Sequence, residues 1–189
     1  MTKNIMIVGV GGQGSLLASK LLGHLLVTQG YDVKVSEVHG MSQRGGSVVT
    51  YVRFGDKVYS PIIDQGEADF IVSFEKLEAA RWLSYLKPDG KVIVSEQETD
   101  PMPVIIGAAE YPSDLIAKMQ ALGVHVDAVD ALGMAQQAGT AKAANLVLMG
   151  RLSRYFDFSE EIWMQAIEDC VPAKFLELNK KAFMMGRGE

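Results

Sequence analysis

The sequence predicts an α/β protein with three α/β/α layers and a Rossmann-like, mixed sheet. Residues 4–10 form a short apolar run, rich in β-branched residues, that ends directly in glycines as a buried strand does. Residues 15–29 then place leucines on one helical face, and residues 32–38 read as a second strand, which gives a β-α-β unit with parallel strands. Residues 47–55 alternate in polarity and precede a turn and residues 58–64, which indicates an inserted hairpin.

The remaining sequence returns to alternating strands and helices. Ser113 is expected to cap one helix, and Ser159, followed by two glutamates, to start another. The length of 189 residues fits one domain, residues 1–189. We expect strands at 69–74, 91–96 and 124–131 with a short one at 104–106, a turn at 87–90, and helices at 75–86, 113–122, 132–138 continuing as 140–156, 160–170 and 173–185.

Composition narrows the class of protein. A net charge of −5 and a pI of about 5.3 argue against nucleic acid or an anionic membrane as the main partner. The single cysteine, Cys170, excludes an intrachain disulfide and an all-cysteine iron–sulfur or zinc site, and it fits a reducing cytoplasm. No segment reaches the roughly 18 apolar residues of a membrane span, and the first ten residues resemble a strand more than a signal peptide.

The glycine loop "GVGGQG", residues 9–14, matches G-x-G-x-x-G between a strand and a helix. One interpretation is a dinucleotide site, in which the glycines admit a phosphate and Glu37 binds a ribose hydroxyl. The other is that the glycines only allow the helix to pack closely on the sheet. The long amide of Gln13 and the hairpin that follows Gly46 both weigh against the dinucleotide interpretation.

The polar run "EVHGMSQRGG", residues 37–46, stands where a dinucleotide-binding fold would continue into a helix. It follows a strand, so we expect it at the carboxyl edge of the sheet beside the glycine loop. Arg44 is suited to a carboxylate or a phosphate. His39 either titrates at a site or makes a structural hydrogen bond, and Glu37 has an alternative role as the partner of Arg44.

Other chemistry-bearing residues point to structural roles. The sequence has no G-x-S-x-G motif, and its three histidines lack metal-ligand spacing, so we expect no metal site. His24, His125 and Cys170 are predicted to be structural. Asn145 lies in the small, nearly apolar run 140–150 and is expected to need a hydrogen-bond partner.

Several motifs in order resemble the gamma subunit or domain of the 2-oxoacid:ferredoxin oxidoreductases. The polar run and the closing "VPAKFLELNKKAFMMG" are most similar to the small-subunit type of the indolepyruvate enzymes. Thr140 departs from the asparagine expected there. The motifs that carry the resemblance are "VGVGGQG", "EVHGMSQRGGSV", "ADFIVSFEKLEA" and "DALGMAQQAGTAKAANLVLMG".

The resemblance implies a complex that oxidises a 2-oxoacid, here an aryl pyruvate, to an acyl-CoA and CO2 with ferredoxin as acceptor. It implies that thiamine diphosphate and [4Fe–4S] clusters belong to other subunits, that this chain alone holds no cofactor and is inactive, and that its loops face the active site of a large (alpha) subunit and help to accommodate coenzyme A. The residues so implied are Gly11, Gly12, Gln13, Gly14, Glu37, His39, Gly40, Ser42, Gln43, Arg44, Gly45 and Gly46, with Asn145 in support.

Two other classes of function stay open on the sequence. A free-standing NAD(P)- or flavin-binding protein predicts that the purified chain carries a dinucleotide. A scaffold subunit without a role in the chemistry predicts that loop substitutions change assembly and leave turnover per complex unchanged. A homodimer of the isolated chain is compatible with each subunit interpretation, because a surface made for a partner often self-associates.

Overall fold

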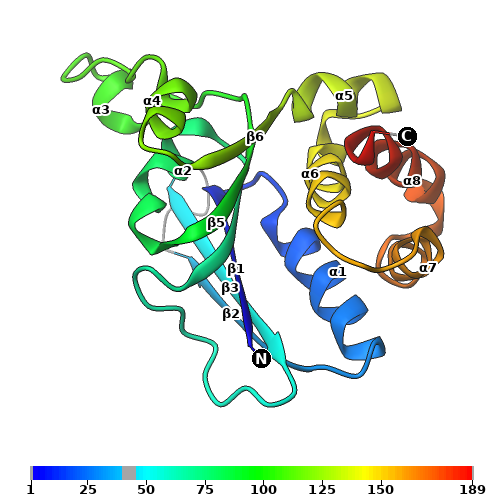
Figure 1. Cartoon of the computed structure of the whole chain (residues 1–189). Coiled ribbons are helices and arrows are strands. Elements are labelled where there is room, and N and C mark those ends of the chain that lie inside the picture. Colours follow the sequence, from blue (N-terminus) through cyan, green and yellow to red (C-terminus); the bar gives the residue numbers. More distant parts are fainter. Residues whose placement is uncertain (1, 40–45, 189) are drawn as a thin grey trace.

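A six-stranded sheet with the strand order β2-β3-β1-β4-β5-β6 forms the centre of the protein (Figure 1). The structure is a computed structural model, and it describes residues 2–39 and 46–188. The strands are β1 (Lys3–Val10), β2 (Asp32–His39), β3 (Ser47–Gly55), β4 (Ala68–Ser73), β5 (Leu86–Ser95) and β6 (His125–Val129). The helices are α1 (Ser15–Thr28), α2 (Lys76–Arg81), α3 (Met102–Ile105), α4 (Leu115–Ala121), α5 (Ala131–Ala138), α6 (Ala144–Ser153), α7 (Glu160–Cys170) and α8 (Leu176–Arg187).

The two faces of the sheet are covered by different helices, as the predicted three layers require. Ile5 and Ile7 of β1 belong to a core cluster with α1 and α5 to α8. Met6 and Val8 belong to a second cluster with α2 and α4. All four side chains are fully buried, so β1 is apolar on both faces, which explains its unbroken hydrophobic run.

The predicted mixed sheet is confirmed, but the hairpin was assigned to the wrong partner. β3 pairs antiparallel with β2 on one side and with β1 on the other. Strands β1 and β2 therefore run in the same direction but are not neighbours. Because both edges of β3 are occupied, residues 58–64 cannot pair with it as the hairpin required. Pro61 has no N–H, and Arg53 Nη1 donates to the carbonyls of Ser60 and Ile62 at 3.1 and 2.6 Å.

Local predictions between β4 and β6 were partly wrong. The expected strand at 104–106 is the short helix α3, which begins after Pro101. The expected helix at 75–86 is divided into α2, which ends at Arg81, and a 3-10 turn, Leu83–Tyr85, and the expected turn at 87–90 lies inside β5. Ser113 does not cap α4, because Asp114 occupies the N-cap in a left-handed conformation with φ 57°. These segments adopt conformations that depend on contacts with distant parts of the chain, which a short stretch of sequence does not reveal.

The helices after β6 lie close to their predicted positions. The expected helix at 140–156 is divided into a 3-10 turn, Ala141–Ala143, and α6, with Thr140 Oγ1 accepting a hydrogen bond from the Lys142 N–H at the start of the turn. Ser159 stands at the N-cap of α7, as predicted. No helix among the described residues is long and apolar enough to cross a membrane.

Cys170 at the end of α7 lies in the core as predicted, with 8% of its surface exposed. Burial raises the pKa of its thiol, so little of the reactive thiolate exists at neutral pH. We expect 5,5′-dithiobis(2-nitrobenzoate) to modify the native protein roughly 100-fold more slowly than the urea-unfolded chain. Absorbance at the released thiolate band measures both rates, and equal rates would contradict the burial.

Candidate functional site

The loops that follow the parallel strands β1, β4, β5 and β6 meet at one edge of the sheet. This is the edge at which open α/β sheets bind ligands. A cavity of about 190 Å³ lies there. It is lined by Gly12, Gln13, Phe74, Ser95, Gln97, Leu132, Ala141, Lys142, Ala144 and Leu148.

The glycine loop is shaped by close contact with α6. Gly12 and Gly14 have φ angles of 97° and 93°, which side chains rarely adopt. A Cβ on Gly14 would also lie 2.9 Å from Asn145 Nδ2. Asn145 Nδ2 donates to the Gly14 carbonyl at 3.2 Å, and its Oδ1 accepts from the Leu146 N–H at 2.9 Å. Asn145 was expected to need a hydrogen-bond partner, and the structure supplies one in the backbone of the glycine loop.

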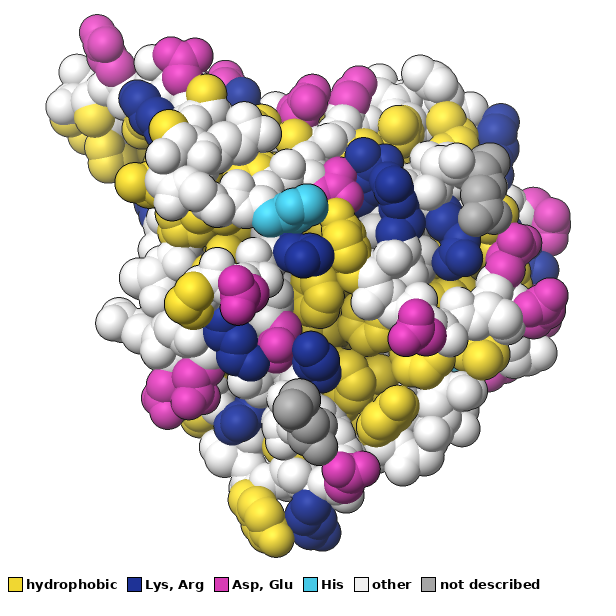
Figure 2. All heavy atoms as spheres, in the orientation of Figure 1, with side chains coloured by type: hydrophobic (Ala, Val, Ile, Leu, Met, Phe, Trp, Pro, Cys, Tyr) yellow, Lys and Arg dark blue, Asp and Glu magenta, His cyan; other side chains and the backbone are white. Residues whose placement is uncertain are grey.

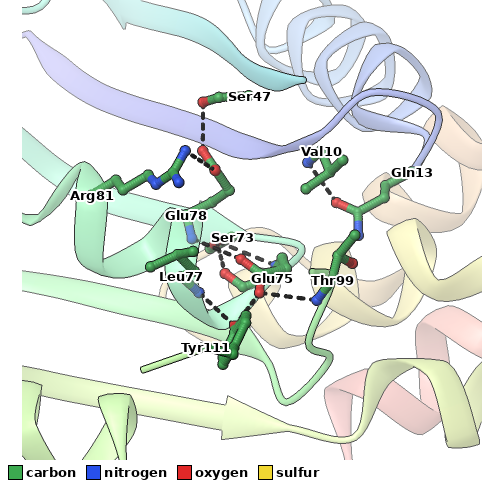
Figure 3. Close-up of polar contacts among 10 residues, drawn as sticks. All are labelled: Val10, Gln13, Ser47, Ser73, Glu75, Leu77, Glu78, Arg81, Thr99 and Tyr111. Atoms are coloured by element: carbon green, nitrogen blue, oxygen red, sulfur yellow. Dashed lines mark hydrogen bonds and ion pairs between the residues drawn. The ribbon is translucent and has the colours of Figure 1, made fainter. Parts of the chain in front are cut away.

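The structure gives the long side-chain amide of Gln13 a role within the glycine loop (Figure 3). Its Oε1 accepts a hydrogen bond from the Val10 N–H at 2.7 Å, which closes the turn after β1. A Cβ at Gly9 would approach this Oε1 to 2.7 Å, so the side chain fills space that a non-glycine residue would need. The amide nitrogen of Gln13 has no protein partner among the described residues, and Gln13 belongs to the lining of the cavity.

Four polar side chains of the cavity have donor groups without a protein partner among the described residues. The Ser95 hydroxyl makes no hydrogen bond there, although the residue is only 2% exposed. The same holds for the side-chain nitrogens of Gln13, Gln97 and Lys142. Ser95 is buried, Gln13 and Gln97 are half-buried, and Lys142 is exposed. This cavity therefore presents donors that suit a ligand or a second protein with carbonyl, carboxylate or phosphate oxygens.

Gly46, the last residue of the polar run, contacts the glycine loop, which agrees with the position expected for this run. The Gly11 N–H donates to the Gly46 carbonyl at 2.9 Å. Glu37 on β2 faces α1, where its Oε1 accepts from the Ser19 hydroxyl at 2.9 Å. His39 is the last residue of β2. The predictions made for Gly40, Ser42, Gln43, Arg44 and Gly45 fall outside the described residues and stay predictions.

Two buried glutamates at this edge were not predicted as site residues. Glu75 is 1% exposed and caps α2, with its Oε2 accepting from the Glu78 N–H at 2.8 Å. Its Oε1 accepts from the Thr99 N–H at 3.2 Å and from the Tyr111 hydroxyl. Burial and the Glu75 carboxylate both raise the pKa of Tyr111, so this hydroxyl stays protonated and donates.

Glu78 links α2 to the start of β3 at the edge of the sheet where the candidate site lies. It is 3% exposed, and its carboxylate accepts from the Ser47 hydroxyl at 2.5 Å and pairs with Arg81 at 3.2 Å (Figure 3). The sequence does carry a signal for the N-cap of α2: Glu75 and Glu78 stand three residues apart, directly after a buried strand. Together, Glu75 and Glu78 hold α2, the β5 exit and the start of β3 in one arrangement.

Two histidines have the structural roles that their positions predicted. His24 Nε2 lies 2.8 Å from Asp169 Oδ2, and this contact lowers the pKa of Asp169. His125 Nε2 lies 3.3 Å from the Tyr155 hydroxyl. No group of three potential metal ligands occurs in the described part of the chain.

Fold and site together define a Rossmann-like α/β protein in which the antiparallel strand β3 separates the parallel strands β1 and β2. Residues 4–189 match the pyruvate ferredoxin/flavodoxin oxidoreductase family, and the chain belongs to that family. The membership in the gamma-type group predicted from the motifs is thereby confirmed.

Named relatives and solved structures agree with this assignment. The chain is 45% identical to indolepyruvate oxidoreductase subunit IorB of Thermococcus kodakarensis, over 97% of this chain and 93% of the relative. It is 37% identical to the IorB subunit of Archaeoglobus fulgidus, over 98% and 94%. Pyruvate oxidoreductase subunit PORC of Thermotoga maritima shares the fold with a TM-score of 0.76 at 20% identity, over 100% and 96%.

A further solved structure contains the same fold inside a longer chain. The 2-oxoglutarate:ferredoxin oxidoreductase of Magnetococcus marinus, solved with 2-oxoglutarate, coenzyme A and succinyl-CoA bound, matches with a TM-score of 0.73 at 20% identity. The match covers 98% of this chain and 30% of that one. The fold therefore occurs both as a separate subunit and as part of a larger polypeptide.

Proposed function

We propose that this chain is the small subunit of an indolepyruvate-type 2-oxoacid:ferredoxin oxidoreductase and acts in the cytoplasm as one gamma-type unit. The complex oxidatively decarboxylates an aryl pyruvate with coenzyme A, giving an acyl-CoA and CO2, and passes two electrons to ferredoxin. Thiamine diphosphate and the [4Fe–4S] clusters belong to the large (alpha) subunit. The identity of 45% to a curated IorB subunit over nearly the full length supports this assignment.

The observation that carries the role of this chain is the cavity beside the glycine loop. Its unpartnered donors, on Gln13, Ser95, Gln97 and Lys142, fit the oxygen-rich groups of coenzyme A or of a partner's active site. The residues that would hold the cofactor are these four and the glycine loop. Coenzyme A supplies the thiol that accepts the acyl group when it is bound.

The free-standing dinucleotide-binding alternative has less support from the geometry. Its ribose-binding acid would be Glu37, whose carboxylate is already bonded to the Ser19 hydroxyl. The strand that follows, β3, inserts beside β1, so the second strand of the β-α-β unit does not neighbour the first. The dinucleotide-binding crevice of a plain Rossmann fold is therefore altered on both counts.

The experiment that tests the function is anaerobic purification of the tagged chain from its native cytoplasm. We expect a large partner that contains iron and thiamine, together with coenzyme A-dependent reduction of ferredoxin by indolepyruvate. Pyruvate and 2-oxoglutarate serve as comparison substrates. A chain that elutes alone, or that carries a nicotinamide or flavin dinucleotide, would contradict the proposal.

Arg44→Ala tests whether the polar run, residues 37–46, contributes to the reaction. We expect turnover per assembled complex to fall at least about tenfold, because a loop cation that binds an anionic group at the active site is lost. Circular dichroism of the isolated subunit should be unchanged. Arg154→Ala, at the exposed end of α6, is the matched control and should retain full turnover. Reduced assembly with normal turnover per complex would instead support the scaffold interpretation.

A further inference from the structure

An apolar arm, here defined as residues 100–110, projects from the body of the protein between β5 and α4 (Figure 1). It contains the helix α3. Met102, Ile105 and Ile106 are 64%, 65% and 68% exposed, respectively. Three large apolar side chains that face solvent within five residues form a local apolar surface, whereas most other exposed large hydrophobic residues are scattered along the chain.

The arm has a defined conformation of its own. The Ile105 N–H donates to the Pro101 carbonyl at 3.1 Å, and the Ala108 and Ala109 N–H groups donate to the Pro103 carbonyl at 2.8 and 3.0 Å. Gly107, with φ 73°, reverses the chain after the helix. An ordered apolar segment loses less conformational entropy on binding than a disordered one, so the arm is preorganised for contact.

Both ends of the arm are fastened to Glu75 at the edge of the candidate site. Thr99 precedes the arm and Tyr111 follows it, and each donates a hydrogen bond to the Glu75 Oε1 (Figure 3). The Lys76 N–H also donates to the Gln97 carbonyl at 3.1 Å. Because Gln97 lines the cavity, the arm and the cavity share one support.

The charged residues of the arm and its flanks are all acidic. Residues 96–114 contain five acids and no lysine, arginine or histidine. Glu98 pairs with Lys76 at 2.5 Å, whereas Asp100 and Glu110, at the two ends of the arm, form no ion pair among the described residues. Figure 2 shows acidic side chains along the top of the projecting lobe and hydrophobic ones on its side.

The exposed apolar side chains and the flanking carboxylates of the arm indicate the chemistry of its partner. An apolar surface between carboxylates fits an apolar cleft with a basic rim. A second copy of this chain would bring an equally acidic arm and a net charge of −5, so like charges would oppose that contact. We propose that the arm docks into an apolar, basic-rimmed cleft of the large subunit. The inference rests on the proposed function, because that function supplies the partner.

Co-expression with the large subunit tests the proposal. The tagged chain is purified anaerobically at low and at high salt, and the ratio of large to small subunit in the eluate is measured. Ile105→Asp should lower the ratio at least about tenfold, as for a central interface residue. The double variant Asp100→Lys/Glu110→Lys should lower it at low salt by a similar factor of about ten, because both attractive carboxylates are lost and the introduced lysines would be repelled by the basic rim.

Tyr59→Asp is the matched control, since Tyr59 is 89% exposed on the β3–β4 connection at the opposite edge of the sheet. It should retain the wild-type ratio. Circular dichroism and thermal unfolding of each isolated variant establish that it is folded.

Wild-type ratios for both arm variants would overturn the arm proposal and leave the proposed function intact. A wild-type chain that retains no large subunit would overturn both. Sedimentation velocity measures self-association of the isolated chain. Arm variants that lose self-association but keep the wild-type subunit ratio would assign the arm to a homodimer and overturn the proposal.

Discussion

Replacing Gly186 by alanine is expected to lower the free energy of unfolding by about 3 kcal/mol or more. A Cβ on Gly186 would lie 2.0 Å from the Val147 carbonyl oxygen and 2.7 Å from the carbonyl carbon. Gly150 of α6 meets the Phe183 carbonyl oxygen of α8 at the same 2.0 Å. The obstructing atoms belong to the backbone, so α6 and α8 must separate, which would loosen the packing of the fully buried Phe183.

Urea denaturation followed by circular dichroism measures this effect. Gly23→Ala is the matched control, because a Cβ there would meet only Val35 Cγ2, at 3.5 Å, which is ordinary contact. Alanine in the interior of α1 should raise stability by roughly 0.5–1 kcal/mol through helix propensity. The two glycine-to-alanine changes are thus expected to have opposite signs. An unchanged midpoint for Gly186→Ala would show that the two helices can separate without cost.

Glu75→Leu is expected to destabilise the protein by about 3 kcal/mol, because a leucine side chain accepts no hydrogen bonds. The Glu78 N–H, the Thr99 N–H and the Tyr111 hydroxyl each lose their acceptor in a site that is 1% exposed at Glu75. Each buried donor left without a partner costs roughly 1–3 kcal/mol. The helix cap of α2 is lost at the same time.

The matching control for Glu75→Leu is Glu98→Gln, which removes only the partly exposed ion pair with Lys76. Its cost should be about 0.5 kcal/mol or less. Amide hydrogen exchange gives a local readout. The Thr99 N–H should exchange faster in Glu75→Leu and at the wild-type rate in Glu98→Gln. Wild-type protection of Thr99 in Glu75→Leu would mean that the carboxylate does not hold the base of the arm.

The sequence predicted the parts of this protein that depend on local pattern. The apolar run of β1, its glycine loop and the leucine face of α1 are contiguous, so their periodicity and the positive φ angles that glycine allows are visible in a short window. The family likewise followed from contiguous motifs. The contact between the glycine loop and Gly46 was predictable because parallel strands place their carboxyl ends on one edge.

Part of the candidate site was visible in the same way. Gln13 and Asn145 stood out as long or buried amides among small residues, and both bind the glycine-loop backbone. Ser95 and Gln97 carried no signal, because one polar residue at the end of a strand and one in a loop are common in any α/β protein. Only the fold brings them to the same cavity as Lys142.

Tertiary structure alone decided the partner of each strand. Residues 58–64 have a strand-like pattern, yet β2 and β1 already occupy both edges of β3, and backbone pairing depends on which edges remain available. The same holds for the buried carboxylate of Glu75, whose partners Thr99 and Tyr111 lie 24 and 36 residues away. Hydrogen bonds and close helix contacts of this kind depend on distances in space, which side-chain periodicity along the chain does not encode.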